Sequence, residues 1–208
     1  MSDDVVLYYN PMSRAQIAHY MLEEVGVPYR IELVNFEKRE HKTEKFLALN
    51  PMGKLPTLVH RGVTVTEAAA ICAYLADAFP KAGLAPAVDD AKRGTYYRWL
   101  FFAASCVEYA ALDKSMSRDP GVASRIGYGS YEDTLNAMEA AIKPGPWILG
   151  DKFSAADVYL GAQLQWGMMT KSIEMRPAFG EYVGRIVQRP AFGRYQEQTK
   201  KFMEQLKG

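Results

Sequence analysis

The apolar pattern of this chain changes character near residue 80. Before that point, short apolar runs rich in β-branched and aromatic residues indicate strands, with helical spacing between some of them. After it, apolar residues recur at helical spacing and the strand signals stop. The pattern therefore predicts an α/β unit followed by an all-helical unit, and no internal repeat suggests a long array.

The α/β unit is predicted to begin with a strand, a helix and a second strand. Residues 5–9 form a short buried run that stops at Asn10-Pro11, and residues 29–34 alternate between apolar and polar side chains. Between them, residues 13–25 carry apolar side chains on one helical face and end before a glycine, which is typical of a helix C-cap. Two strands joined by a helix imply a parallel, right-handed crossover.

The rest of this unit is predicted as a charged segment, a β-hairpin and a helix. Residues 36–48 favour a short exposed helix or an irregular segment with one apolar edge. Strands at 55–59 and 63–65 flank the connection His60-Arg61-Gly62, and a helix over 67–79 follows them. The order βαβ-α-ββα makes a compact module with a mixed sheet.

Residues 80–90 separate the two units. They contain Pro80, Gly83 and Pro86 among small residues, a composition typical of linkers. We therefore expect a first domain at 1–80, a linker at 81–90 and an all-helical domain at 91–208. Helices of the second domain are predicted at 91–112, 128–142, 154–170, 178–188 and 190–206.

Charge and apolar content argue against several classes of function. The 25 basic and 24 acidic residues leave a net charge of +1, and no basic cluster indicates a nucleic-acid or membrane-surface partner. No stretch approaches the ~20 apolar residues of a membrane span. The acidic start Met1-Ser2-Asp3-Asp4 does not resemble a secretory signal, so we expect a cytoplasmic protein.

The sequence also lacks the common metal and nucleophile motifs. His19, His41 and His60 lie far apart without metal-ligand spacing, so no metal site is predicted. Cys72 and Cys106 form no C-x-x-C pair, which argues against a redox motif and favours a reducing compartment. A G-x-S-x-G elbow and a glycine-rich phosphate loop are both missing.

The densest candidate for chemistry is the segment from Tyr8 to Arg14, where a strand runs into the N-terminus of a helix. Unpaired backbone N–H groups and the helix dipole favour an anion there, including a thiolate. Ser13 is either only the N-cap of the helix or a residue that contacts such an anion. Capping alone does not account for Arg14 and two tyrosines, Tyr8 and Tyr9, converging on this point.

Two further segments carry polar groups at strand ends. In residues 50–58 a proline, Pro56, enters a strand; it is either a cis site that turns backbone groups outward toward a peptide ligand or a plain turn. Glu67 begins a helix, where a carboxylate is favoured electrostatically and can also receive a ligand ammonium. Ser154 and Asp157, by contrast, predict a structural capping box.

In their order along the chain, these features resemble the cytosolic glutathione transferase family over essentially the whole length. The motifs are N-P-x-G-K-L-P-x-L at 50–58, [ST]-E-x-x-A-I at 66–71 and S-x-x-D at 154–157. The chain resembles a bacterial member of unassigned class. The resemblance implies a thioredoxin-like first domain that binds glutathione as co-substrate and a helical second domain that binds the acceptor.

The resemblance assigns binding roles residue by residue. The backbone of Leu55, before the cis-proline Pro56, would pair with the cysteinyl part of glutathione, and Glu67 with the next residue would hold the γ-glutamyl group. That next residue is Ala68 where the family commonly has serine, so a hydroxyl contact is lost while the backbone N–H remains. Cations near the glycyl carboxylate are expected at Lys54 above all, and at His41 and Lys42.

Two residues are candidates for stabilising the thiolate. Read forward from the strand, Tyr-Tyr-x-Pro-x-Ser resembles the serine-type classes and assigns the role to Ser13. Counted back from Gly-Val-Pro-Tyr at 26–29, Tyr8 falls where tyrosine-type classes keep their phenol, and Arg14 where some keep an assisting arginine. We rank Ser13 first. In either case a hydrogen bond and positive potential lower the pKa of the thiol from ~8.5 toward neutrality.

The resemblance also implies a reaction and a partner. The glutathione thiolate would attack a small apolar electrophile held between the domains, and a homodimer is expected. Alternatives are a glutathione-dependent isomerase or dehalogenase, and a non-catalytic binding protein with the same fold. The residues that line the acceptor pocket, or else belong to the helical core, are Tyr97, Phe101, Phe102, Ser105 and Tyr109.

Overall fold

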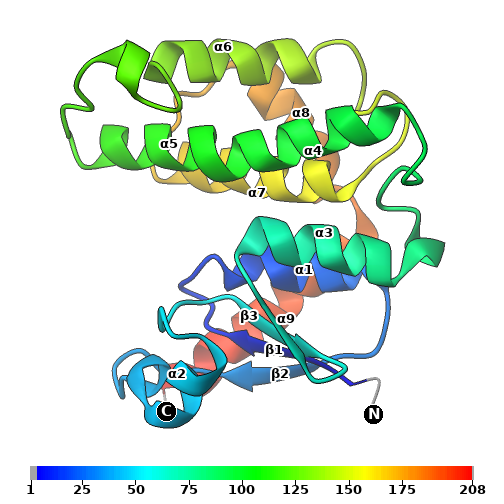
Figure 1. Cartoon of the computed structure of the whole chain (residues 1–208), viewed down its shortest axis with the longest axis vertical. Coiled ribbons are helices and arrows are strands. Elements are labelled where there is room, and N and C mark those ends of the chain that lie inside the picture. Colours follow the sequence, from blue (N-terminus) through cyan, green and yellow to red (C-terminus); the bar gives the residue numbers. More distant parts are fainter. Residues whose placement is uncertain (1–3, 208) are drawn as a thin grey trace. The chain divides into compact units, whose positions relative to one another are not determined.

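A computed structural model describes residues 4–207, and the chain divides into two compact units (Figure 1). One unit runs to Ala82 and takes in the chain from Arg189 onward, and the other spans Gly83–Gln188. Within the described residues, the four strands of the sheet belong to the first unit, and the second unit is helical. The predicted α/β unit followed by a helical unit is therefore confirmed.

The four strands form one mixed sheet in the order β2-β1-β3-β4. β1 runs parallel to β2, as the strand–helix–strand pattern predicts, and antiparallel to β3, which pairs with β4. The register places Tyr8 opposite Thr57, and Thr57 opposite Thr66, so β1 and β4 end where β3 begins. The strand bounds are β1 (Val5–Tyr9), β2 (Arg30–Leu33), β3 (Thr57–His60) and β4 (Val63–Thr66).

The turn between β3 and β4 is shorter than predicted. His60 belongs to β3, so only Arg61 and Gly62 connect the strands, with φ values of 54° and 77°. Positive φ at both central residues gives a two-residue turn whose twist matches that of the strands. At the other end of β3, Leu55 and Pro56 precede the strand, although the pattern had placed them in it.

Two helices of the first unit, α1 (Ala15–Val25) and α3 (Ala68–Ala78), lie side by side against the sheet (Figure 1). Helix α1 begins two residues later than predicted, because residues 11–14 form a turn. The charged segment folds as the 3-10 turn η1 (Glu40–Lys42) and the short helix α2 (Glu44–Leu49), which confirms its helical alternative. Phe46 is the buried apolar edge of α2.

The last helix, α9 (Pro190–Lys207), belongs to the first unit and lies beside α1. Two ion pairs join α9 and the residue before it to α1: Arg189 Nε donates to Glu24 Oε1 at 2.6 Å, and Arg194 Nε donates to Glu23 Oε2 at 2.6 Å. The expected second domain ran to residue 208. The structure instead groups α9 with the sheet, because its buried apolar residues and these charges contact α1.

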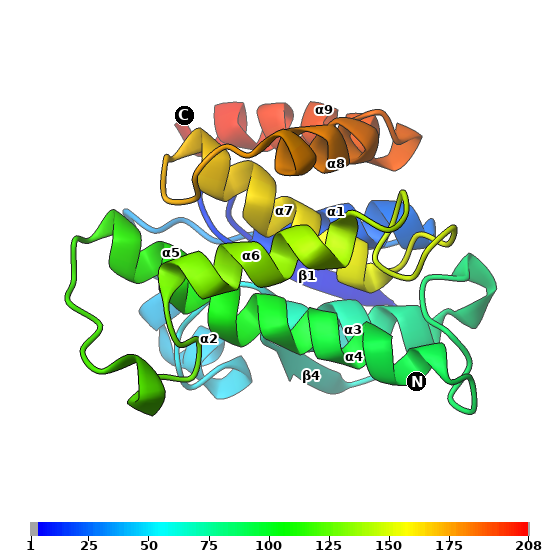
Figure 2. The same ribbon diagram turned by 90° about the horizontal axis from the view of Figure 1, so that it is seen from above.

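The second unit contains five α-helices within the described residues (Figure 2). The helix predicted at 91–112 extends to Ser115 and is interrupted by a π-helical turn, η3 (Ala103–Val107). The remaining predicted helices are all present. The bounds are α4 (Lys92–Phe102), α5 (Glu108–Ser115), α6 (Tyr131–Ile142), α7 (Ala155–Met169) and α8 (Pro177–Val187), with a short 3-10 turn at η4 (Ala123–Arg125). Another 3-10 turn, η2 (Pro80–Ala82), belongs to the first unit.

Asp157 confirms the predicted capping box at the start of α7. Its Oδ2 accepts the N–H of Ser154 at 2.8 Å, and its Oδ1 accepts the N–H of Ile148 and the hydroxyl of Tyr182, both at 2.8 Å. Burial raises the pKa of this carboxyl, and the hydrogen bonds oppose that rise. Asp157 thus joins a loop, α7 and α8, which is a structural role.

Three further observations bear on the predicted class. No helix of the described residues is long and apolar enough to span a membrane. Cys72 and Cys106 are both free, Cys72 in the core and Cys106 half-buried. Met1-Ser2-Asp3, on which the expectation about export partly rests, lie outside the described residues.

Candidate functional site

The candidate residues of the first unit gather at one end of the sheet. The register Tyr8–Thr57–Thr66 brings three chain segments to adjacent strands, and neighbouring strands lie ~4.8 Å apart. Ser13 follows β1, Leu55-Pro56 precedes β3, and Glu67-Ala68 follows β4. The fold thus brings Ser13 together with residues that lie more than forty positions further along the sequence.

The segment after β1 is a turn anchored by Asn10, which is 4% exposed. Its Nδ2 donates to the carbonyl of Val34 at 2.8 Å, and its Oδ1 accepts the N–H of Met12 at 2.8 Å. The carbonyl of Asn10 accepts both the N–H of Ser13 at 3.1 Å and its hydroxyl at 2.7 Å. Residues 10–13, called the first turn below, are therefore fixed from two sides.

Ser13 is half-buried, and its hydroxyl is engaged on both sides. Oγ donates to the Asn10 carbonyl and accepts the N–H of Ala15 at 3.2 Å. The residue at the N-cap position is Arg14, which is exposed and makes no side-chain cap. Ser13 therefore satisfies one amide at the start of α1, and its O–H can turn from the Asn10 carbonyl toward an incoming anion.

The two tyrosines before the turn point to opposite faces of the sheet, as successive strand residues do. Tyr8 is half-buried with its ring edge-on to Phe46 of α2 at 5.7 Å. Tyr9 is fully buried, and its hydroxyl hydrogen-bonds Thr199 of α9 at 3.0 Å. Burial raises the pKa of Tyr9 to about 12. The interpretation that both tyrosines converge on the turn is wrong for Tyr9, which belongs to the core.

The segment before β3 repeats the arrangement of the first turn. Asn50 is 4% exposed, donates from Nδ2 to the carbonyl of Lys54 at 2.9 Å, and accepts the N–H of Met52 at 3.1 Å. Its carbonyl accepts the N–H of Gly53 at 2.8 Å. Residues 50–53 are called the second turn below. The Leu55–Pro56 peptide bond that follows is cis, as predicted.

Cationic side chains gather around the second turn. Burial first, and then the charges of Lys42, Arg39 and Lys54, hold the pKa of His41 below its usual value of 6.5. Lys42 Nζ donates to the carbonyl of Met52 at 3.0 Å, while Lys54 is exposed. Among the described residues, His41 Nδ1 is buried without a hydrogen-bond partner. The predicted cations are therefore close together, on the segment that leads into the cis-proline.

Glu67 joins β4 to α3 in a backbone conformation that is rare for a residue with a side chain. Its φ is 63° and its ψ is 118°, and it is exposed. Such a conformation costs on the order of 1 kcal/mol or more and often marks a functional site. No side chain caps α3, and its first hydrogen bond runs from the Ile71 N–H to the Glu67 carbonyl at 2.9 Å. The amides of Ala68 to Ala70 lie outside the helical ladder, at the positive end of the dipole.

In the second unit, four of the five acceptor candidates are exposed. They recur every fourth residue along α4, η3 and α5, and the rings of Tyr97 and Phe101 stack with centroids 6.0 Å apart. This exposure excludes the alternative that they are bundle core. Phe102 is half-buried against Trp99. The exposed four are Tyr97, Phe101, Ser105 and Tyr109.

Sequence reasoning missed the two buried asparagines that hold the turns. Asn10 and Asn50 each stand before Pro-Met, and this repeated tripeptide is the signal that would have identified them. A third omission is Gln16, whose side chain contacts the first turn from α1. No group of three or more potential metal ligands occurs in the part of the chain that the structure describes.

Two family models match this chain. The model described as Glutathione S-transferase, N-terminal domain, matches residues 4–77. The model described as Glutathione S-transferase, C-terminal domain, matches residues 85–167. Both matches carry the same family description, one over the segment that contains the sheet and the other over most of the helical unit.

Individual proteins give the same result. The chain is similar to Glutathione S-transferase GstA of Escherichia coli O157:H7, with 29% identity over 167 residues, covering 79% of this chain and 83% of the relative. A solved glutathione transferase from Methylococcus capsulatus has a TM-score of 0.79 and 30% identity, covering 94% of this chain and 98% of that one. A sphingomonad glutathione S-transferase, solved with glutathione, has a TM-score of 0.77 and 31% identity at the same coverage.

Proposed function

This chain belongs to the glutathione S-transferase family, and on that premise we propose that the end of the sheet bearing the two turns and the start of α3 is its glutathione site. The protein is a glutathione transferase with glutathione as co-substrate. The arrangement at Glu67 carries the assignment. An exposed carboxylate lies directly before the first N–H groups of α3, which make no hydrogen bond within the helix. The two together suit a ligand group that has both an ammonium and a carboxylate, as γ-glutamyl does.

The γ-glutamyl group is assigned to Glu67 and Ala68. The Glu67 carboxylate would pair with the ligand ammonium, and the N–H of Ala68 would donate to the ligand carboxylate. The methyl side chain of Ala68 adds no hydroxyl, so the helix amides carry this contact alone. The backbone of Leu55, held beside the fixed carbonyl of Lys54, would pair with the cysteinyl residue in the manner of an added strand.

The glycyl carboxylate is assigned to the cations around the second turn. Lys54 is exposed, and its charge contributes to the lowered pKa of His41, so the two side chains lie close to each other. An anion there would offset the mutual repulsion of these groups with Arg39 and Lys42. The whole tripeptide would then span the sheet end, from the start of α3 to η1.

Ser13 is the first candidate for the thiolate partner and Tyr8 the second. The Ser13 hydroxyl sits at the N-terminus of α1, where the helix dipole favours a negative sulfur, and the exposed Arg14 adds positive charge. The Tyr8 ring is half-buried on α2. With the thiol proton released to solvent, the sulfur attacks the carbon of an electrophile, a C–S bond forms, and the leaving group departs with its electron pair.

A conjugation assay with a chlorinated nitrobenzene tests both the function and this ranking. Wild type should consume glutathione and release chloride, and Ser13→Ala should lower kcat/KM about a hundredfold. Tyr8→Phe should remain within threefold of wild type. If Tyr8→Phe loses activity and Ser13→Ala does not, Tyr8 is the thiolate partner and Ser13 is not. If wild type neither binds nor consumes glutathione, the proposed function is wrong.

The acceptor is assigned as a small apolar electrophile, with an aromatic ring favoured. The exposed rings of Tyr97, Phe101 and Tyr109 offer stacking partners, and Ser105 offers a single hydroxyl among them. Comparing aromatic with alkyl halides at matched reactivity tests this preference. Equal kcat/KM values for the two series would count against the aromatic assignment.

A homodimer in the cytoplasm is the expected state. The family resemblance supports it, because members pair the first domain of one chain with the second domain of another. Size-exclusion chromatography with light scattering at micromolar concentration measures the mass directly. A mass equal to one chain of 23.3 kDa would exclude the dimer.

A further inference from the structure

One side chain links the first turn to the C-terminal helix. Gln16, in the first turn of helix α1, is half-buried. Its Nε2 donates to the carbonyl of Pro11, and its Oε1 accepts the hydroxyl of Tyr195 on α9. Tyr195 is 5% exposed and packs its ring against Phe192 and Tyr20. A residue near the end of the chain is therefore two hydrogen bonds away from the segment that carries Ser13.

The chemistry of this link fixes its direction. The amide of Gln16 donates through Nε2 to a carbonyl and accepts a hydroxyl through Oε1, so the two partners together set the orientation of this side chain. Burial raises the pKa of Tyr195 above its usual range, which keeps the phenol protonated as the donor. The Asn10 carbonyl is already held by Ser13, and Gln16 holds the next carbonyl, that of Pro11.

We propose that Gln16 and Tyr195 are positioning residues, through which α9 holds the first turn in the conformation that presents Ser13 to the glutathione sulfur. This proposal rests on the proposed function, with Ser13 as the thiolate partner. Neither residue touches the reacting atoms. Their loss would remove the anchor on the Pro11 carbonyl and leave only the bonds made by Asn10 and Ser13, so Ser13 would sample orientations that donate poorly to sulfur.

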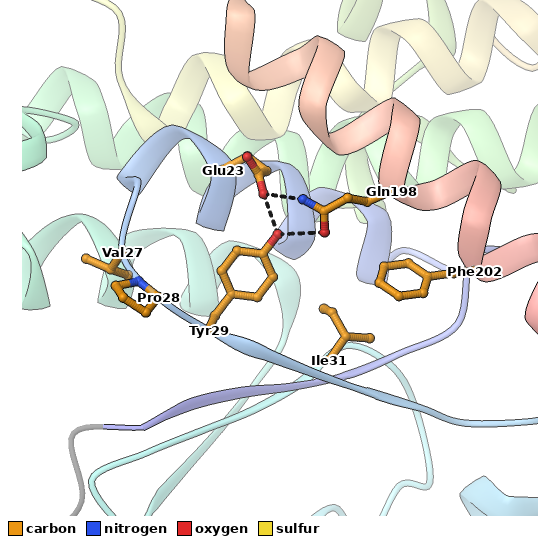
Figure 3. A pocket seen from close by; sticks show the side chains of 7 residues that line it. All are labelled: Glu23, Val27, Pro28, Tyr29, Ile31, Gln198 and Phe202. Carbon is orange, nitrogen blue, oxygen red and sulfur yellow. Dashed lines mark hydrogen bonds between the residues drawn. The ribbon is translucent and has the colours of Figure 1, made fainter.

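Other hydrogen bonds of α9 within the described residues lead to groups outside residues 10–13, and they supply controls. Figure 3 shows one group: Gln198 of α9 donates from Nε2 to Glu23 at 2.7 Å, and its Oε1 lies 3.2 Å from the hydroxyl of Tyr29, which also contacts Glu23. These residues border an open cavity of about 410 Å³, which Val27, Pro28, Ile31 and Phe202 also line. A second such contact is the hydrogen bond between Thr199 and Tyr9.

The experiment compares hydroxyl deletions that differ in whether they lead to the turn. Tyr195→Phe and Gln16→Met break the link, while Tyr29→Phe removes a hydroxyl that contacts Gln198 of α9, and Thr199→Val removes the α9 hydroxyl that contacts Tyr9. The readouts are the pKa of the bound glutathione thiol, followed by thiolate absorbance against pH, and kcat and KM with a chlorinated nitrobenzene. We expect the link variants to raise that thiol pKa and to lower kcat about threefold to tenfold, with KM for glutathione within twofold.

The controls should lose stability without moving the thiol pKa. If Tyr195→Phe and Gln16→Met match Tyr29→Phe in both thiol pKa and kcat, the inference is overturned. It is equally overturned if the link variants alone fail to fold, because their role is then structural. Failure of wild type to bind glutathione would instead refute the proposed function.

A double-mutant cycle with Ser13→Ala shows whether the link acts through Ser13. In that background Tyr195→Phe should cause less than a twofold further loss of kcat, since there is no hydroxyl left to position. A full, additive loss would overturn the inference. So would a Ser13→Ala variant with wild-type kcat, because the turn would then carry no thiolate partner.

Discussion

The tripeptide Asn-Pro-Met occurs twice in the first unit, at 10–12 and 50–52, and both copies fold into the same turn. In each, a buried asparagine accepts the N–H of the methionine and donates to a backbone carbonyl, that of Val34 after β2 in one copy and that of the nearby Lys54 in the other. One copy leads into a helix and the other into a strand. The turn geometry therefore belongs to the tripeptide and its asparagine, independent of the element that follows.

The two turns differ at their fourth residue. Ser13 adds a hydroxyl to the first turn, whereas Gly53 has a φ of 60° and no side chain. A Cβ at Gly53 would lie 2.7 Å from both the His41 carbonyl and Lys42 Nζ. The same turn thus carries a hydroxyl in the first case, which we propose as the thiolate partner, and in the second leaves room for a cationic segment to pack closely. The fourth residue, Ser13 or Gly53, therefore determines whether the turn carries a hydroxyl or allows another segment to approach its backbone.

Among the variants considered, Gly53→Ala in the second turn should cause the largest loss of unfolding free energy. The new Cβ would collide with a backbone carbonyl and would require a left-handed backbone, so we expect a loss of about 3 kcal/mol in unfolding free energy. KM for glutathione should rise as well, because the cations near Lys54 would shift. Urea denaturation and initial-rate kinetics measure the two effects.

Gly62→Ala is the matched control for that substitution. Gly62 also has a positive φ, 77°, but a Cβ there meets nothing within 4 Å. It should therefore cost only the backbone term, about 1 kcal/mol, and leave KM unchanged. Equal losses for the two variants would show that close packing at Gly53 contributes nothing.

Replacing the two asparagines should separate the turns by function. Asn10→Ala removes the side-chain donor to the carbonyl of Val34, and Asn50→Ala removes one of the two side-chain donors to the carbonyl of Lys54, so we expect a cost of about 2 kcal/mol for the first and about 1 kcal/mol for the second. Asn10→Ala should lower kcat about tenfold, because that turn holds Ser13. Asn50→Ala should instead raise KM for glutathione about fivefold, because it fixes the carbonyl of Lys54. Kinetics at varied glutathione concentration distinguish the two outcomes.

Asn136→Ala controls for loss of an amide as such. Asn136 is an exposed residue of α6 that accepts a hydrogen bond from Arg176 at 2.8 Å, and its loss should move neither kcat nor KM for glutathione. If Asn10→Ala and Asn50→Ala change kcat and KM in the same proportion, the prediction that the first turn affects kcat and the second turn affects glutathione binding is wrong.

The two turns also show what the sequence can predict. Prolines and glycines at strand ends identified both segments, because their backbone restrictions act locally. The convergence of Ser13, Pro56 and Glu67 required the strand register, which the sequence leaves to a family resemblance. The predicted start of α1 at Ser13 was two residues early, since the hydroxyl of Ser13 bonds the Asn10 carbonyl and extends the turn.

Long-range partners are the part that local patterns do not encode. The periodicity of residues 190–206 predicted a helix correctly but not its partner, because an amphipathic face fits any complementary surface. Its packing on α1 depends on pairs such as Glu24 with Arg189, which lie far apart in the chain. The link from Tyr195 to Gln16 escaped sequence reasoning for the same reason.

His41 should give the second turn a weak pH response, the smallest of the expected effects. Its pKa lies below 6.5 in the unliganded protein, chiefly through burial and then through Lys42, Arg39 and Lys54. A glycyl carboxylate nearby would raise that pKa. Binding would therefore take up a proton at pH values between the pKa of free His41 and its higher pKa in the complex. Affinity for S-methylglutathione should therefore tighten about twofold to threefold as the pH falls from about 7.5 to about 5.5.

S-Methylglutathione isolates this effect, because it has no titrating thiol and its carboxylates stay ionised over the range. His19 does not interfere strongly, since burial lowers its pKa to about 4. Calorimetric titration of wild type and His41→Gln at several pH values measures the difference. The wild-type affinity should rise toward acid while that of His41→Gln stays flat. Parallel pH profiles would place His41 outside the range of the ligand carboxylate and leave that contact to Lys54.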